Sequence, residues 1–254
     1  MDADANATPG VRATGPMRSF IVPAHDEEAS VAATVRSIAT AAAAADAVHE
    51  IIVVDDASMD RTAQLAAAAG ARVIHVDLRH IAAARNAGAS AASGSTFVFV
   101  DADTLIASDV VVALQRVMTA GAIGGGAAVR FDEPTPRWAK LALPASIWLA
   151  RRFRITGGCF LFCSRVAFEA VGGFDEALFA AEEIRLCRQL RIRGDFVILR
   201  QAVLTSGRKL RTYSGWELLK SLAGVFFAGR AGIRDRSRLG IWYGPRRPDG
   251  PRFE

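Results

Sequence analysis

The sequence predicts an α/β protein with a mostly parallel central sheet flanked by helices. Short apolar runs that suit buried strands alternate with Ala-rich segments that suit helices, and the connections between them are short. Acidic residues directly follow several of the apolar runs. Because parallel strands end at one edge of the sheet, where open α/β sheets bind their ligands, we expect these acids to meet there.

Length and composition agree with this class. The 254 residues, 51% of them hydrophobic, are enough for one large α/β domain or two small ones. No window approaches the ~18 uninterrupted apolar residues of a membrane-spanning helix. Cys159, Cys163 and Cys187 are scattered and form no Cys-x-x-Cys motif, which favours reduced thiols in a cytoplasmic protein. Residues 1–17 are polar, lack the pattern of a secretion signal and are expected to form a disordered lead-in.

In the first part of the chain, each expected strand is a short apolar run and each expected helix is rich in small residues. Asp26 is expected to cap the first helix, and Gly70 to end the second. The expected elements are strands 19–23, 50–54, 71–76 and 96–100, and helices 28–45, 62–69 and 81–92.

The second part continues the alternation less regularly. Residues 109–119 have the periodicity of an amphipathic helix. The run 123–130 predicts a strand, although three consecutive glycines at 124–126 weaken the pattern. The other expected elements are helices 138–152, 166–171 and 181–193, strands 157–164 and 196–199, and an amphipathic helical extension with a basic tail over 213–254.

The most informative stretch is Asp101-Ala102-Asp103, directly after the apolar run 97–100. One intervening residue lets two short acids serve the same small volume at a strand end, where strict alternation lapses. One or two protein carboxylates suffice for Mg²⁺ or Mn²⁺ when substrate phosphates and water complete the coordination shell. In isolation the pattern is more typical of a solvated turn or a helix cap, so its meaning depends on the other strand ends.

Two other strand ends carry similar groups. Residues 23–27 (Pro-Ala-His-Asp-Glu) follow the first strand, and Asp55 and Asp56 follow the second. Converging acids repel one another unless a cation or ligand donors offset their charge, and Arg85 is available nearby in sequence. Such a set suits a neutral base and ribose beside a metal-bound diphosphate. The alternative is that these acids only cap helices, which we accept for Asp109.

Together these motifs resemble glycosyltransferase family 2, over roughly residues 18–200. The resemblance implies the GT-A fold, a nucleotide-sugar donor, most of all a UDP-sugar, and inversion at the anomeric carbon. It also implies a GT-A domain over 18–212, with a nucleotide-binding part at 18–104 and an acceptor part at 105–212. The matching motifs are residues 22–28, 53–62, 83–88, 101–103, 172–176 and 181–188.

The resemblance implies a role for each matching residue of the nucleotide-binding part. In it, Pro23, Ala24 and Glu27 border the nucleoside. Asp55 or Asp56, together with Arg85, holds the base. Asp101 lies by the ribose or the metal, and Asp103 ligates a divalent metal, Mn²⁺ or Mg²⁺, on the diphosphate.

Glu182-Glu183 stands where the family usually has Glu-Asp, whose second acid is the general base. Glu183 is therefore the expected base, with Glu182 as the alternative. Displacement at an anomeric carbon passes through an oxocarbenium-like state and needs a carboxylate to take the acceptor's proton. Two acids at the start of a helix are also electrostatically favourable there, which is the alternative explanation. Gly158 is expected to let the backbone approach the sugars closely.

One departure from the family concerns the metal. Many GT-A enzymes have a later His as a further ligand, but no His follows His80 in this chain. Residues 205–208 (Thr-Ser-Gly-Arg) fall near that place. The alternatives are that water completes the shell, that Arg208 with Lys209 offsets part of the diphosphate charge, or that metal dependence is weak.

Charge is divided unevenly along the chain. Residues 1–136 carry 9 Arg and 16 acids, and residues 137–254 carry 22 Arg or Lys and 10 acids. A basic half predicts a polyanionic or membrane partner, and no nucleic-acid-binding motif is present. The apolar and basic segment 213–238, with 141–152, would form a peripheral membrane contact at the inner face of the membrane, with a lipid-linked acceptor. The alternatives are packing on the core and a contact in a homo-oligomer.

Other function classes stay open at this point. A sugar-1-phosphate nucleotidyltransferase has a similar sheet, but it needs a Gly-rich phosphate loop and a Lys after the first strand. A non-catalytic sugar-nucleotide or lipid-binding module would use the same binding residues without turnover. A hydride-transferring enzyme is disfavoured, because Gly-x-Gly-x-x-Gly is absent.

Overall fold

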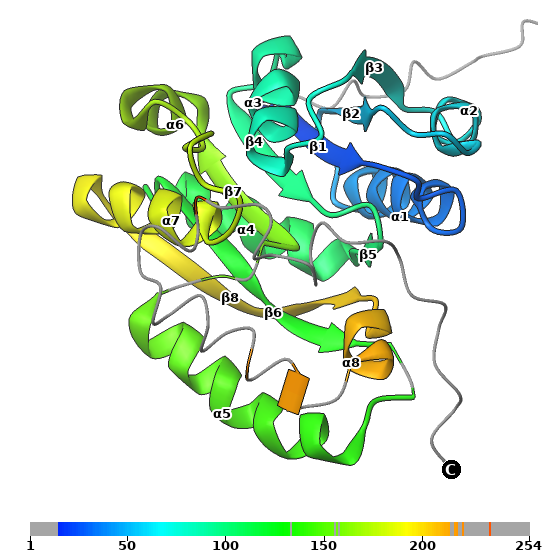
Figure 1. Ribbon diagram of the computed structural model, residues 1–254. Coiled ribbons are helices and arrows are strands. Elements are labelled where there is room, and N and C mark those ends of the chain that lie inside the picture. Colours follow the sequence, from blue (N-terminus) through cyan, green and yellow to red (C-terminus); the bar gives the residue numbers. More distant parts are fainter. Residues whose placement is uncertain are drawn as a thin grey trace, which may run out of the picture.

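The computed structural model describes residues 15–213 except 133, 155 and 157, together with residues 216, 217, 220 and 234. Within these residues one sheet of eight strands has the order β3-β2-β1-β4-β7-β6-β8-β5, and helices cover both of its faces (Figure 1). The strands are β1 (Arg18–Ala24), β2 (His49–Asp56), β3 (Arg72–Val76), β4 (Thr96–Val100), β5 (Thr104–Leu105), β6 (Gly124–Phe131), β7 (Phe160–Ser164) and β8 (Phe196–Thr205).

The helices alternate with these strands along most of the chain. They are α1 (Val31–Ala44), α2 (Thr62–Ala68), α3 (Ile81–Ala91), α4 (Ser108–Thr119), α5 (Arg137–Phe153), α6 (Arg165–Val171), α7 (Glu182–Arg193) and α8 (Arg208–Thr212). The expected α/β class is therefore confirmed. No helix of the described residues is long and apolar enough to cross a bilayer.

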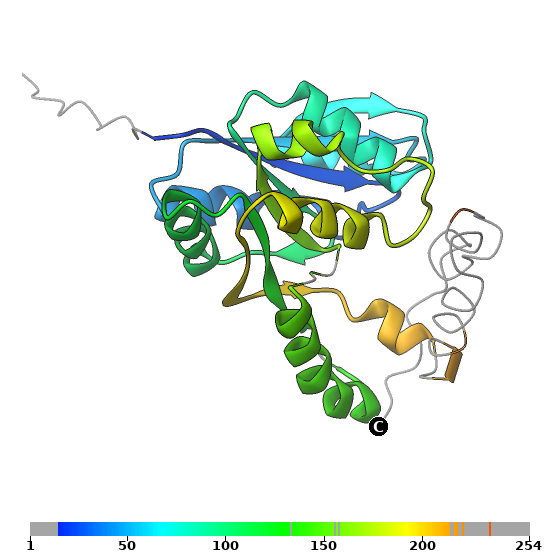
Figure 2. The ribbon, with the colours of Figure 1, turned by 90° about the vertical axis from the view of Figure 1, so that its left-hand side faces the viewer.

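The sheet is parallel in its first half and mixed in its second. Strands β1, β2, β3 and β4 are all parallel neighbours. Strand β7 runs antiparallel between β4 and β6, and β8 returns parallel to β6. The rotated view in Figure 2 shows that β6, β8 and α5 extend away from the parallel half of the sheet.

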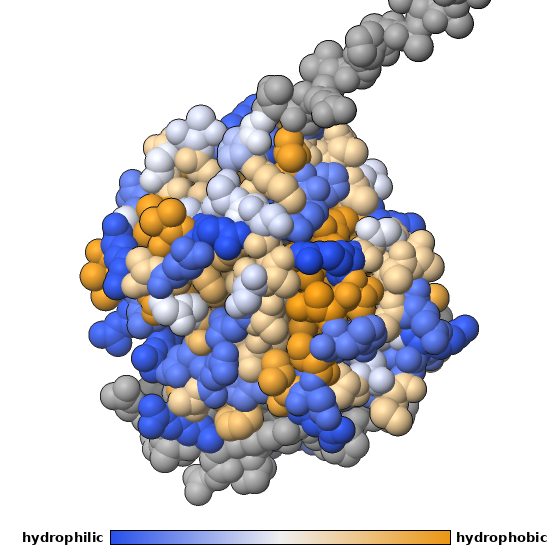
Figure 3. All heavy atoms as spheres, turned by 90° about the horizontal axis from the view of Figure 1, so that it is seen from above, coloured by the Kyte–Doolittle hydropathy of each residue, from blue (hydrophilic) through white to orange (hydrophobic). Residues whose placement is uncertain are grey.

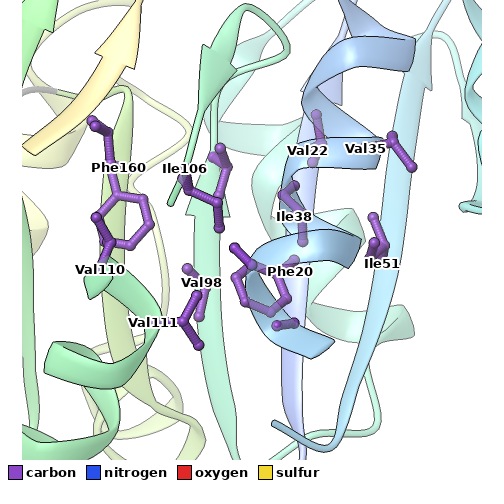
Figure 4. Packing of buried hydrophobic residues seen from close by; sticks show 14 of the residues in the cluster. Phe20, Val22, Val35, Ile38, Ile51, Val98, Ile106, Val110, Val111 and Phe160 are labelled. Atoms are coloured by element: carbon purple, nitrogen blue, oxygen red, sulfur yellow. The ribbon is translucent and has the colours of Figure 1, made fainter. Parts of the chain in front are cut away.

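Strands β1, β2 and β4 are buried on both faces, which explains their uninterrupted apolar runs. In β1, Phe20 and Val22 face α1, while Ile21 lies in the cluster on the other side of the sheet. Figure 4 shows Phe20 and Val22 beside Ile38 of α1, with Val98 of β4 next to them. The face seen from above has apolar and hydrophilic residues interspersed (Figure 3).

Several expected boundaries were wrong. Strand β8 reaches Thr205 rather than residue 199, because it pairs with β6 along its length and with β5 at its end. Its polar Arg200 and Gln201 made it look shorter, since they fall where the β6 pairing shifts register. Strand β5 and helix α8 were not predicted, because two- and five-residue elements leave no periodic signal.

The first helix begins later than expected. Its N-cap is Ser30 rather than Asp26. Asp26 instead adopts a positive φ of 51° and accepts the backbone N–H of Met59 at 2.7 Å. The side chain that was expected to cap a helix thus joins the β1–α1 loop to the β2–α2 loop.

The glycines at 124–126 lie inside β6, so the strand expected over 123–130 is confirmed. A Cβ at Gly125 would collide with the carbonyl oxygen of Val197 and with the ring of Phe162. Glycine is needed there because two neighbouring strands approach closely. The lead-in and the extension expected at the two ends fall almost wholly outside the described residues.

Candidate active site

The turn after β4 carries Asp101 and Asp103. The backbone N–H of Asp101 donates to the carbonyl of Cys159 at 3.1 Å, and its carbonyl accepts the N–H of Thr104 at 3.0 Å. Ala102 is buried, and its carbonyl accepts the hydroxyl of Thr34 on α1 at 2.8 Å. These bonds hold the turn from both sides, so the two acids are presented on a fixed backbone.

Arg85 of α3 lies at the centre of the site and is only 2% exposed. Its Nη1 donates to Glu182 Oε1 at 2.9 Å. Its Nη2 donates to Asp101 Oδ1 at 2.9 Å and to the carbonyl of Gly158 at 3.0 Å. One planar guanidinium thus joins the β4 turn, the turn before β7 and the first residue of α7.

The charges around Arg85 compensate its burial. The guanidinium carbon lies 5.2 Å from the centre of the Phe174 ring, and the Nε atom has no hydrogen-bond partner within the described residues. Burial opposes the positive charge, but the nearby carboxylates of Asp101 and Glu182 outweigh it, so the pKa of Arg85 is raised. Removal of this cation would leave the buried Glu182 carboxylate without its counter-ion.

Glu183 lies next to this network at the start of α7. Burial, and then the neighbouring Glu182, raise the pKa of the Glu183 carboxyl to about 8, although Arg85 acts in the opposite direction. Gly158 separates the two groups, since a Cβ there would lie 3.2 Å from Arg85 Nη2 and 3.7 Å from Glu183 Oε1. A glycine at this position leaves open the space between the guanidinium and the carboxyl.

The two acids that end β2 have different surroundings. Asp56 accepts the backbone N–H groups of Leu78 and Arg79 at 2.7 Å and of His80 at 3.0 Å. Asp55 Oδ2 lies 3.0 Å from His75 Nδ1, whereas its buried Oδ1 has no partner within the described residues. Asp56 therefore holds the loop before α3, and Asp55 retains an acceptor for a ligand.

The loop after β1 reaches the start of α8. Ala24 pairs with Asp55 in the parallel ladder, so Pro23 and Ala24 lie beside the end of β2. The Glu27 carboxylate accepts the hydroxyl of Ser30 at 2.8 Å and lies 3.5 Å from Arg208 Nη2. This ion pair joins the loop after β1 to the helix that follows β8.

Asp103 lies at the same edge, next to the end of β8. The Thr205 hydroxyl donates to Asp103 Oδ1 at 3.4 Å and accepts from Thr104 at 2.8 Å. Within the described residues, no three His, Cys, Asp or Glu side chains lie where they could hold a metal ion together. Asp101 and Asp103 still offer the hard oxygen donors that suit Mg²⁺ or Mn²⁺, provided that phosphate and water oxygens complete the shell.

The structure brings one group of expected residues into a single network, and places the rest around it. The network consists of Arg85, Asp101, Gly158, Glu182 and Glu183. Arg85, for which the resemblance implied a contact with the base, has both terminal nitrogens engaged by protein oxygens.

Sequence reasoning missed three contacts of the site. Thr205 lies against Asp103, His75 against Asp55, and Phe174 against Arg85. Thr205 falls in the stretch where the family resemblance implied a metal-binding His, and Phe174 falls within the matching motif 172–176. Nothing in the sequence indicated a role for His75 in the site, apart from its position in the strand expected over 71–76.

Comparison with known proteins gives a family match. The family described as "Glycosyl transferase family 2" matches residues 19–169. The chain is 30% identical over 203 residues to "Succinoglycan biosynthesis protein ExoO" of Rhizobium meliloti (strain 1021). That alignment covers 75% of this chain and 56% of the relative, so the chain spans little more than half of the relative's length.

Solved structures share the fold. The mannosyltransferase PcManGT from Pyrobaculum calidifontis, in complex with GDP-Man and Mn²⁺, has a TM-score of 0.65 at 18% identity, over 87% of this chain and 65% of that one. Glucosyl-3-phosphoglycerate synthase from Mycobacterium tuberculosis, in complex with Mn²⁺, UDP and glucosyl-3-phosphoglycerate, has 0.61 at 21%, over 87% and 82%. S. aureus TarS 1-349 with UDP-GlcNAc has 0.59 at 16%, over 89% and 70%. The expected GT-A fold is confirmed.

Proposed function

Because this chain belongs to glycosyltransferase family 2, we propose that it transfers a sugar from a nucleotide-sugar donor to an acceptor hydroxyl, with inversion at the anomeric carbon. The observation that carries the proposal is the network around Arg85. It joins an acid of the β4 turn to the acid pair of α7 through one guanidinium, with Arg85 bonds of 2.9 Å to Asp101 and Glu182. The group proposed for the donor diphosphate and the acids proposed for the acceptor hydroxyl are thereby held at a fixed separation.

The nucleoside would bind where β1 and β2 end. Pro23, Ala24 and Glu27 border this place, and the unpartnered Oδ1 of Asp55 accepts a ring N–H of the base. A uracil or guanine ring offers such a donor. We propose UDP, the nucleotide in the glucosyl-3-phosphoglycerate synthase complex, while the mannosyltransferase was solved with GDP-Man. Asp56 supports the site from behind by holding the loop before α3.

Asp103 and Asp101 would hold Mn²⁺ or Mg²⁺ on the diphosphate. The glucosyl-3-phosphoglycerate synthase was solved with each of these metals in complex with UDP. A bound divalent ion offsets negative charge that grows on the leaving diphosphate. Arg208, which lies 3.5 Å from Glu27 at the same edge, adds a second positive charge beside the diphosphate.

Glu183 is the proposed general base. Glu182 is 4% exposed, and its Oε1 already accepts a hydrogen bond from the buried Arg85. Glu183 lies across Gly158 from that cation, and its pKa is raised to about 8 by burial. The ionised form of Glu183 takes the acceptor's proton, and its raised pKa favours that uptake, while Glu182 positions Arg85.

The test uses single-residue variants and two measurements. Glu183→Gln should lower turnover of a UDP-sugar by about 10²–10⁴-fold, the usual range for a positioned base, and should leave UDP affinity unchanged. Asp103→Ala should abolish the Mn²⁺-dependent part of UDP binding in calorimetry. Glu169→Gln, which removes a mostly exposed carboxylate on α6, is the matched control.

Three outcomes would contradict the proposal in distinguishable ways. Nucleotide binding without turnover in the wild type indicates a binding module instead of an enzyme. If Glu182→Gln is the crippling change and Glu183→Gln is not, the roles of the two acids are exchanged. Formation of a nucleotide-sugar from a sugar 1-phosphate and a nucleoside triphosphate indicates a nucleotidyltransferase.

A further inference from the structure

Helix α5 presents an apolar face to the solvent. Trp138, Leu141, Ala145 and Trp148 recur at spacings of three and four residues, so they lie along one side of the helix. All four are exposed, Leu141 by 87% and Trp148 by 64%. Ala139, on the opposite side of the helix, is buried. The helix therefore turns toward solvent the kind of face that a helix of a water-soluble domain normally buries.

Among the described residues, the place of α5 in the fold leaves this face accessible. The helix lies beyond β6 and β8, away from the parallel half of the sheet (Figures 1 and 2). It follows the end of β6 directly, and it is not among the helices that form the two core clusters over the described residues. A large exposed apolar surface rimmed by polar residues marks an interaction site.

The charged residues of α5 itself and of the turn that follows it are all positive. Residues 134–168 contain six Arg or Lys and no Asp or Glu. Lys140 near one end of α5, and Arg151, Arg152 and Arg154 at the other, are exposed. Trp and Leu side chains partition into the boundary between lipid headgroups and acyl chains, and Arg and Lys pair with lipid phosphates. Both properties match an anionic lipid surface.

The helix also leads directly into the candidate active site. It ends at Phe153, five residues before Gly158, whose carbonyl accepts a hydrogen bond from Arg85. Arg191 of α7 also donates a hydrogen bond to the carbonyl of Phe153, so the end of α5 contacts the helix that carries the acid pair. The end of α5 is thus tied to the helix from which the proposed base projects.

We propose that the chain docks on an anionic lipid surface through the α5 face, defined as Trp138, Leu141 and Trp148 with Lys140, Arg151 and Arg152. Exposed Trp residues suit the boundary between a bilayer and water, and the basic residues with no acid over 134–168 suit anionic lipid headgroups. Docking does not depend on the proposed function. Its consequence for the acceptor does, because a docked α5 would turn the acid pair toward a hydroxyl attached to a lipid.

The test is co-sedimentation of the full chain with vesicles, without nucleotide. The wild type should sediment with vesicles of phosphatidylcholine and phosphatidylglycerol, and not with phosphatidylcholine alone. The double variant Leu141→Ser/Trp148→Ser should bind at least about tenfold more weakly, because two apolar side chains are removed from the interface. Arg151→Ser/Arg152→Ser should bind about 25-fold more weakly, since each basic residue near such a surface contributes about fivefold.

Matched controls remove similar groups elsewhere. Val166→Ser takes away an apolar side chain that is 77% exposed on α6, and Arg36→Ser/Arg116→Ser removes two exposed charges from α1 and α4. Both controls should bind like the wild type, and thermal melting should show that all variants fold. Glu183→Gln should also keep wild-type vesicle binding, so failure of the proposed function is separable from failure of docking.

Several results would overturn docking through this face. They are no sedimentation of the wild type with anionic vesicles, equal binding to phosphatidylcholine alone, and unchanged binding of either α5 double variant. Concentration-dependent self-association of the wild type that Leu141→Ser/Trp148→Ser abolishes, without vesicle binding, would show that the face is a contact between two copies of the chain.

Discussion

At the scale of single residues, Arg85 determines the geometry of the site. Its two terminal nitrogens contact Glu182, Asp101 and the carbonyl of Gly158, each at 2.9 or 3.0 Å. The three contacts come from segments that are far apart in sequence. A lysine keeps the charge but has no planar fork, so it cannot reproduce all three directions at once.

Arg85→Lys should therefore lower both stability and turnover. Breaking a buried ion pair costs about 3–5 kcal/mol of stability. The loss should be smaller than that here, because lysine keeps the positive charge. The melting temperature should fall by several degrees, since about 1 kcal/mol shifts it by ~2–4 °C in a domain of this size. Turnover should fall more than donor affinity, because Asp101 and Glu182 lose their common anchor.

The exposed Arg61, which pairs with Glu28, gives the matched control. Arg61→Lys should leave melting and turnover unchanged. Arg85→Lys with wild-type melting and turnover would show that the network is not needed, and that Arg85 acts elsewhere.

Glu183 also makes stability depend on pH. Its pKa is raised from an ordinary value of 4.5 to about 8 by burial and by Glu182. The folded state then binds more protons than the unfolded state between these values, so the free energy of unfolding falls as pH rises through this window. Glu183→Gln should flatten this dependence and should be more stable than the wild type near pH 8.

Melting temperatures across pH 4.5 to 8 test this expectation. Glu169→Gln, whose carboxylate is mostly exposed, should keep the wild-type slope. A Glu183→Gln profile parallel to the wild type would mean that the Glu183 carboxyl is ionised throughout, like an exposed acid.

At the scale of elements, the segment from Thr205 to α8 closes the side of the site where Asp103 lies. Thr205 contacts Asp103, and Asp132 at the end of β6 accepts the N–H of Gly207 at 2.5 Å and Arg211 Nη1 at 2.7 Å. Arg208 reaches across to Glu27 at 3.5 Å. This segment holds a cation where the family resemblance implied a metal-binding His.

Arg208→Ala should therefore weaken binding of the diphosphate more than binding of the nucleoside. Hydrogen bonds to charged groups contribute about 1.5–3 kcal/mol, so UDP affinity should fall roughly 10- to 100-fold. Uridine affinity, measured by the same calorimetry, should stay unchanged and is the internal control. An equal loss for UDP and uridine would place Arg208 near the base, or in the frame of the site, instead.

The elements also show where sequence patterns stop being informative. Strands β1, β2 and β4 were predicted within one or two residues, because burial on both faces leaves continuous apolar runs. The predicted strand ended before Arg200, because β8 is partly exposed and its pairing with β6 is irregular at this point. Its end matters for function, because Thr205 is its last residue and the partner of Asp103.

At the scale of the whole molecule, the site forms where two kinds of sheet meet. The parallel strands β1, β2 and β4 bring the nucleotide-binding candidates to one edge. The antiparallel β7 then connects this half to β6 and β8, and its preceding turn supplies Gly158. The two expected parts, 18–104 and 105–212, thus share one continuous sheet, which fixes the acid pair of α7 relative to the β4 turn.

The sequence by itself determined the α/β class, the family and the acids at the ends of β2 and β4. These properties are local, because each depends on a run of neighbouring side chains. Only the tertiary structure decided that Arg85 is buried between Asp101 and Glu182, that Asp56 is occupied by backbone N–H groups, and that Glu183 lies across Gly158 from the cation. The reason is physical. Whether two charges pair depends on their distance and burial, and both are decided by the packing of segments that lie far apart in the sequence.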